Sequence, residues 1–169
     1  MKKIICFGLL ACLLACNNKE KETTTTETTA VEEETETFAT APFVPGSNPN
    51  SKLFVWKASP DYTRRRNDAV TPALLNADTL IKGINEINEN ILLEKVKQSG
   101  DTLYTQIKNS NYLGNQMGST GAEIYVADVV LNLTEVPGIK YVSIEMEEQS
   151  HVQPGTWSRK DFEKYKPIY

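Results

Sequence analysis

His151, the one histidine of the chain, follows a run of carboxylates and is the residue best suited to acid–base chemistry. Glu147 and Glu148 come shortly before it, so a carboxylate–imidazole pair could transfer protons in a hydrolytic reaction. However, alternation along an extended segment directs Glu147 and Glu148 to opposite faces, and no second histidine completes a usual zinc ligand set. We therefore predict no metal, no cofactor and no catalysis. A hydrolase that uses Glu147, Glu148 and His151 is kept as an alternative.

Three consecutive arginines, Arg64, Arg65 and Arg66, form the strongest ligand-type feature of the sequence. A guanidinium group pairs bidentately with carboxylates and phosphates, so these side chains could hold anionic groups of a cell-envelope polymer. Aspartates lie on both sides of the three arginines, and a self-neutralised loop exposed to solvent is the simpler interpretation. We predict a polar loop over residues 61–72 and keep the three arginines as possible ligand-binding residues.

Several other chemistries lack their sequence signatures. All three cysteines, Cys6, Cys12 and Cys16, stand at the start of the chain, so the remainder has no thiol nucleophile, thiolate metal site or disulfide. No glycine-rich phosphate loop follows a predicted strand. The net charge is −4, of which residues 1–15 contribute +2 and residues 17–50 contribute −5, leaving about −1 for the rest. This balance gives no basic face of the kind that nucleic-acid binding needs.

The first sixteen residues are typical of an export signal. Lys2 and Lys3 precede an apolar run that ends at Leu14, which is too short to span a bilayer stably. Ala15 directly before Cys16 resembles the lipobox of bacterial lipoproteins, in which the signal peptide is removed and the new terminal cysteine is acylated. By this resemblance residues 1–15 are a signal peptide and Cys16 carries the lipid. A cut before Cys12, or an ordinary secretory signal with an incidental cysteine, are the alternatives.

The predicted lipid anchor places the protein in the bacterial cell envelope, as a membrane-anchored lipoprotein of the outer membrane that faces the periplasm or the surface. Residues 16–50 are rich in threonine and glutamate and have little apolar surface to bury, which predicts a disordered stalk. Residues 51–169 are long enough for one ordinary domain with a C-terminal tail.

Hydrophobic periodicity within this domain predicts an α+β fold. The predicted elements are, in order, strand 53–56, helix 76–89, strands 92–97 and 102–107, a helix opening at residue 120, and strand 139–146. This β-α-β-β-α-β order predicts a small sheet of about four strands with two helices packed on one face. In the tail, Ser158 is expected to cap a short helix that ends at residue 165.

Local signals set the expected boundaries of these elements. Asn76 is a suitable cap for the first helix, and Thr120 and Glu123 have the spacing of a capping box for the second. Taking Ser99-Gly100 as a two-residue turn pairs Val96 with a core position of the next strand. The second helix is apolar on most sides, which predicts that it is largely buried.

Two segments carry a resemblance to a known family. Gly118-Ser119-Thr120-Gly121-Ala122-Glu123 and Leu133-Thr134-Glu135-Val136-Pro137-Gly138 resemble the sporulation and spore-germination domain family of the GerMN type, in which a buried helix turns at Pro-Gly into a strand. The resemblance covers roughly residues 52–146. By this resemblance the protein would be a single-domain bacterial lipoprotein. The resemblance also implies a fold similar to that of ring-building motifs that oligomerise, and an exported, lipid-anchored envelope protein. The family supplies no catalytic residues.

The leading hypothesis is a lipid-anchored binding module of the cell envelope that binds a protein partner or a cell-wall component such as peptidoglycan, and no nucleic acid. A structural subunit that oligomerises as a ring or scaffold is the alternative. Four aromatic residues near loops are candidates for stacking on sugar rings, although packing at the edge of the core is the simpler interpretation: Trp56, Tyr62, Tyr112 and Trp157.

Overall fold

The structure, a computed structural model, describes residues 48–169. The predicted signal peptide over residues 1–15, Cys16 and the predicted stalk up to residue 47 lie outside the described residues. Within residues 48–169 every helix is too short or too polar to cross a bilayer.

The described chain has the predicted α+β architecture, with two sheets in place of one. The larger sheet has the order β3 (Leu93–Ser99), β4 (Thr102–Ile107), β5 (Tyr141–Met146), β6 (Gly155–Ser158). The smaller sheet has the order β1 (Trp56–Ala58), β2 (Thr63–Arg66), β7 (Lys166–Ile168). The helical elements are α1 (Ala77–Ile87), α2 (Asn111–Asn115), α3 (Gly118–Leu133) and the short 3-10 turns η1 (Pro72–Leu74) and η2 (Arg159–Phe162).

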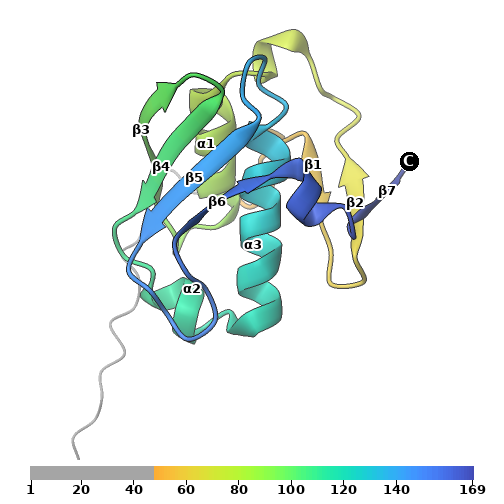
Figure 1. Cartoon of the computed structure of the whole chain (residues 1–169). Helices are drawn as coiled ribbons and strands as arrows, with labels where there is room; N and C mark the ends of the chain where they lie inside the picture. The colour runs from red at the N-terminus through yellow and green to blue at the C-terminus, as the bar shows by residue number, and fades with distance from the viewer. Residues whose placement is uncertain (1–47) are drawn as a thin grey trace, which may run out of the picture. The chain divides into compact units, whose positions relative to one another are not determined.

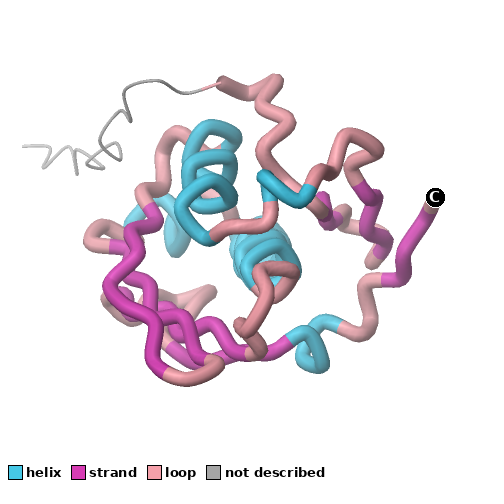
Figure 2. The backbone as a smooth tube through the Cα atoms, turned by 90° about the horizontal axis from the view of Figure 1, so that it is seen from above, coloured by secondary structure: helices cyan, strands magenta, loops and turns pink. Residues whose placement is uncertain are grey.

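Helices α1 and α3 lie on one face of the larger sheet, as predicted (Figure 1 and Figure 2). β4 and β5 are parallel neighbours, and α3 belongs to the crossover between them. The predicted strand 139–146 is confirmed as β5, and its alternate residues Val142, Ile144 and Met146 are buried and form its inner face.

Helix α3 forms the centre of the core. Every residue from Tyr125 to Leu133 is buried, which confirms the predicted burial of this helix. Its start differs from the prediction, because α3 begins at Gly118 with no side-chain cap, so the predicted capping box is wrong. The Glu123 carboxylate instead accepts a hydrogen bond from the Tyr165 hydroxyl at 3.0 Å, which links α3 to the C-terminal segment.

Helix α1 begins where the sequence indicates. The Asn76 side chain accepts a hydrogen bond from the Thr79 amide at 2.8 Å, which confirms the cap. The helix ends at Ile87, two residues before the predicted end. Gly83 lowers the helix propensity, and the structure gives the reason for a glycine here: a Cβ atom would lie 1.9 Å from the Leu53 carbonyl oxygen.

Replacing Gly83 with alanine is therefore expected to destabilise the protein. Helix propensity alone would favour alanine by up to about 1 kcal/mol. The clash with the Leu53 backbone is overpacking, which costs about 1–3 kcal/mol and reverses the sign. Urea unfolding of Gly83→Ala should show a lower free energy of unfolding than the parent chain. An unchanged or higher value would mean that residues 51–54 do not pack against α1 as described.

The β3–β4 hairpin forms with a register different from the predicted one. The pair Ser99 and Thr102 closes the hairpin, so the two-residue turn is Gly100-Asp101 and not Ser99-Gly100. The register also shifts at a bulge between Lys95 and Lys97. Val96, expected to face the core, is 53% exposed. Leu103 pairs with Gln98 in its place, and Val96 is the extra residue of the bulge, which has no partner on β4.

The smaller sheet occupies sequence that was predicted as loop and tail. The first strand starts at Trp56, so most of the predicted strand 53–56 precedes it. Thr63–Arg66, within the predicted loop 61–72, pairs with β1 on one side and with β7 on the other. Residues 155–158, within the predicted C-terminal tail, are an edge strand of the larger sheet. Ser158 does open a helical turn with Asp161, but that turn ends at Phe162.

Two polar side chains of α3 attach β1 to the core. The Asn132 amide oxygen accepts hydrogen bonds from the amides of Val55 (2.6 Å) and Trp56 (3.0 Å), and its amide nitrogen donates to the Trp56 carbonyl (2.8 Å). The Asp128 carboxylate accepts a hydrogen bond from the Ala58 amide at 2.7 Å. α3 thus provides partners that a neighbouring strand would otherwise give to β1.

Candidate functional site

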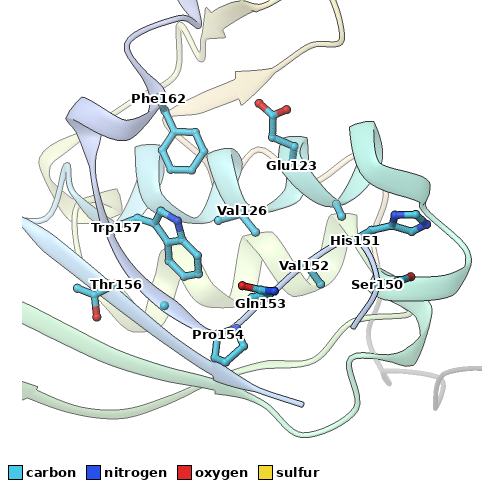
Figure 3. Close-up of a pocket in the computed structure, with 12 residues that line it drawn as sticks. Glu123, Val126, Ser150, His151, Val152, Gln153, Pro154, Thr156, Trp157 and Phe162 are labelled. Atoms are coloured by element: carbon cyan, nitrogen blue, oxygen red, sulfur yellow. The ribbon is translucent and has the colours of Figure 1, made fainter. Parts of the chain in front are cut away.

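A cavity of about 560 Å³ lies between α3 and the extended segment 150–157 (Figure 3). We call it the Trp157 cavity. Its lining combines apolar side chains from the core with polar side chains near solvent. Helix α3 contributes Ala122, Glu123 and Val126, and the extended segment contributes residues 150–157. Phe162 of η2 is the last lining residue. Two elements far apart in the sequence therefore build this site.

Aromatic rings lie at one end of the cavity. Trp157 and Phe162 lie close together there, and His151 lies at the other end (Figure 3). The Trp157 indole lies against its own strand, because a Cβ atom on Gly155 would be only 2.9 Å from the indole ring. Gly155 therefore allows the indole to lie close to β6, while Phe162 is 5% exposed and is held in the core.

The polar side chains of the cavity are partly engaged with one another. The Gln153 amide nitrogen donates to the Glu148 carboxylate at 2.8 Å, and Thr156 is exposed. Glu123 accepts from Tyr165 and also forms a salt bridge with Lys164. Burial, followed by the hydrogen bond to Glu123, raises the pKa of Tyr165. At neutral pH this hydroxyl is thus a donor that fixes the Glu123 side chain.

The residues proposed for hydrolysis are not brought together. Glu147 and Glu148 are exposed, and within residues 48–169 no hydrogen bond or salt bridge joins either of them to His151. The described part of the chain also contains no group of three His, Cys, Asp or Glu residues placed to hold a metal ion. Only His151 of the three lines the cavity.

His151 instead meets a residue that the sequence analysis did not single out. Its Nδ1 atom lies 2.9 Å from the Ser119 hydroxyl, at the first turn of α3. Both side chains are exposed. Serine hydrolases add a third group that orients the imidazole, and His151 has no hydrogen bond to a carboxylate in the described chain. The pair therefore fixes the position of the 150–152 turn against α3 without forming a triad.

The three arginines lie away from this cavity. Arg64 is half-buried with its guanidinium group stacked on the Trp56 ring, 4.8 Å from the ring centroid. The Arg66 guanidinium lies 5.8 Å from the same centroid, and Arg65 is exposed. Their placement in a strand is a correction to the predicted loop, and none of them lines the Trp157 cavity.

Of the four aromatic candidates for sugar stacking, only Trp157 lines this cavity. Trp56 is buried, and its indole nitrogen donates to the Glu135 carboxylate at 2.8 Å. Tyr62 lies against Tyr165 with 5.6 Å between ring centroids. The part of α3 that lines the cavity could not be recognised beforehand, because Glu123 was assigned to a cap.

Comparison with known proteins gives one match. The family model Germane, described as sporulation and spore germination, matches residues 18–152. The match includes all of α3 and the turn into β5, and it ends within the extended segment that lines the cavity. No curated protein and no solved structure matches the chain.

Proposed function

Because the chain belongs to the Germane family of sporulation and spore germination, we propose that it is a binding module of the bacterial cell envelope and not an enzyme. Family membership suggests a role related to sporulation or germination. The proposed ligand is a cell-wall component, namely a glycan–peptide fragment of peptidoglycan. A lipid on Cys16 would hold the module at the membrane.

The observation that carries this proposal is the mixed lining of the cavity between α3 and residues 150–157. Its volume of about 560 Å³ falls in the range of small-ligand sites, about 300–1,000 Å³. Trp157 offers an aromatic surface with apolar character, and the lining residues Gln153 and Thr156 carry amide and hydroxyl groups. Amphipathic sugar and peptide units need this combination of an apolar surface and a few polar groups.

The arrangement of the acid and base groups supports a site that binds rather than one that catalyses. Proton transfer needs an acid and a base within hydrogen-bond reach of one reacting group. Here Glu148 bonds to Gln153, Glu123 bonds to Tyr165, and His151 bonds to Ser119. Each of these groups therefore holds part of the cavity wall, which suits a site that binds.

Binding to insoluble peptidoglycan tests this proposal. The chain that begins at Asn17, with Gln153→Ala and Thr156→Val combined, is expected to bind about ten-fold more weakly, because two polar contacts of about 0.5–1.5 kcal/mol each are removed. Both residues are exposed, so the free energy of unfolding should stay within about 0.5 kcal/mol of the parent value. Co-sedimentation with purified wall measures the binding.

The matched control changes the same residue types elsewhere. Gln98 and Thr120 are exposed and line no part of the cavity. Gln98→Ala combined with Thr120→Val should bind peptidoglycan like the parent chain. If the parent chain itself fails to sediment with the wall, or if both double variants bind equally, the proposed site is wrong.

The proposed anchor is tested separately in cells that express the full chain. Replacing Cys16 with alanine is expected to abolish incorporation of radiolabelled palmitate and to release the protein from the membrane fraction. One acyl chain gives only marginal membrane binding, and stable anchoring needs more than one, so loss of the acylated cysteine should be decisive. A parent chain that takes up no label and is recovered freely soluble would overturn the anchor.

The edge strand β3 is the observation that would favour an oligomer. Its unpaired edge carries Val96, which is 53% exposed and could add to another sheet. The same strand also has a bulge between Lys95 and Lys97. A bulge and lysine side chains on an edge strand both prevent it from pairing with the edge strand of another molecule. We therefore place the ring or scaffold subunit second. Sedimentation as a strict monomer at micromolar concentration would count against it.

A further inference from the structure

We propose that a second site, the groove lined by Arg64, Arg159, Lys160 and Lys166, binds a phosphate group. This groove has a volume of about 530 Å³ and shares no lining residue with the Trp157 cavity. The proposal therefore does not depend on the wall-binding function, and a failure of one leaves the other standing.

Three elements build the groove, one from the first half of the described chain and two from the C-terminal segment. Arg64 comes from β2, Arg159 and Lys160 come from η2, and Lys166 begins β7. β2 and β7 are parallel neighbours, with Arg64 opposite Pro167 in the register. This pairing brings the first of the three arginines together with cations of the C-terminal segment, which the sequence alone did not indicate.

The groove has an excess of positive charge. Its lining contains four cations and one carboxylate, that of Glu163. Among the described residues only Arg159 of these cations forms a salt bridge, with Glu135 at 2.7 Å. Arg64, Lys160 and Lys166 form no salt bridge with any residue from 48 to 169. Burial lowers the pKa of Arg64, and the nearby positive charge of Arg159 lowers it further, although Glu135 and Tyr169 act in the opposite direction. An anion in the groove would relieve this repulsion.

The two guanidinium groups are held in place before any ligand binds. Arg64 stacks on Trp56, and its Nε and Nη1 atoms are buried without a hydrogen-bond partner. Arg159 is fixed by hydrogen bonds from Nη2 to the Leu131 carbonyl at 2.9 Å and the Thr134 hydroxyl at 3.1 Å. Arginines with a fixed planar head lose little further entropy on binding, and their geometry matches phosphate oxygens.

A second cavity of about 380 Å³ shares Arg159 and Lys160 with the groove, and its lining also contains Lys140 and Ser158. The two spaces together offer room for more than a single phosphate ion. A phosphate carried on a soluble molecule and a phosphate of a lipid headgroup share the chemistry that this site recognises.

The test uses the chain that begins at Asn17, which keeps every described residue. Two probes are titrated, inorganic pyrophosphate by calorimetry and phosphatidylcholine vesicles with and without phosphatidylglycerol by flotation. Lys160→Gln combined with Lys166→Gln is expected to weaken binding at least ten-fold. Both lysines are exposed, so the variant should fold like the parent. Binding should also weaken as salt concentration rises.

The control variant combines Lys52→Gln with Lys97→Gln, which removes the same charge from exposed positions outside the groove. It should bind within two-fold of the parent chain. Binding of pyrophosphate that only the groove variant loses supports the site with a soluble phosphate. Binding of anionic vesicles alone, with the same loss, supports a lipid headgroup. If neither probe binds, or if both variants lose binding equally, the proposed site is wrong.

Discussion

A chain carrying Val130→Asp is expected to show no cooperative unfolding transition. Val130 is 0% exposed and lies in the part of α3 that is buried without interruption. An aspartate there would either carry a buried charge without a partner or have to be protonated. Either outcome lowers the free energy of unfolding by several kcal/mol. A domain of this size has a total stability of about 5–15 kcal/mol, so this loss is decisive. Thermal unfolding followed by near-ultraviolet circular dichroism measures it.

The control makes the same substitution at an exposed site. Val96 is 53% exposed on the edge strand β3, so Val96→Asp should change the free energy of unfolding by about 0.5 kcal/mol or less. A cooperative transition in Val130→Asp, only slightly shifted from the parent, would show that α3 is not the centre of the core.

Replacing Asn132 with leucine is expected to lower the free energy of unfolding by about 3–5 kcal/mol. Leucine has a similar size but leaves the buried amides of Val55 and Trp56 without their acceptor, at about 1–3 kcal/mol for each. The Trp56 carbonyl also loses its donor. Urea unfolding measures the loss, and hydrogen exchange locates it.

Hydrogen exchange distinguishes a local loss of stability at β1 from a general destabilisation of the domain. The Val55 and Trp56 amides should exchange much faster in Asn132→Leu, while amides of the β4–β5 pair keep their protection relative to the new global stability. Asn115→Leu serves as the control, because Asn115 is exposed. Equal effects of the two substitutions would mean that α3 does not support β1 through Asn132.

Strong periodicity made parts of this fold predictable. The buried face of β5 and the burial of α3 follow from apolar spacing, and the start of α1 follows from the Asn76 cap. The hairpin was predicted, but its register was not, because the turn lies at Gly100-Asp101 and a bulge at Val96 then shifts the pairing again by one residue. A bulge depends on local backbone geometry and leaves little trace in hydrophobic pattern.

The smaller sheet could not be predicted for a different reason. Its strands have only three or four residues. β2 and β7 lack the alternation that marks a strand, and the alternation of β1 extends over three residues only, which is too short to be recognised. β1 is held by the side chains of Asp128 and Asn132, and β2 is held between β1 and β7. The contacts of β1 with α3 join residues 70 and 77 positions apart along the chain, and β2 pairs with β7 over a still longer separation.

The same reasoning applies to the candidate sites. The sequence singled out Trp157, His151 and Arg64, and each of them lines one of the two sites. It did not indicate which residues would join them. Glu123 and the 150–157 segment meet only because α3 packs next to that segment, and Lys166 follows Arg64 by about 100 residues. Single residues with suitable chemistry are visible in a sequence, whereas their grouping depends on tertiary structure.

The most direct test of the central claim is the response of the two tryptophan indole groups to a soluble glycan–peptide fragment of peptidoglycan. The chain has only Trp56 and Trp157, and each gives one indole N–H resonance. Trp157 lines the proposed site, whereas Trp56 is buried with its indole bonded to Glu135. We predict that titration shifts the Trp157 resonance to saturation and leaves that of Trp56 in place. An unmoved Trp157 resonance at saturating fragment would contradict the account.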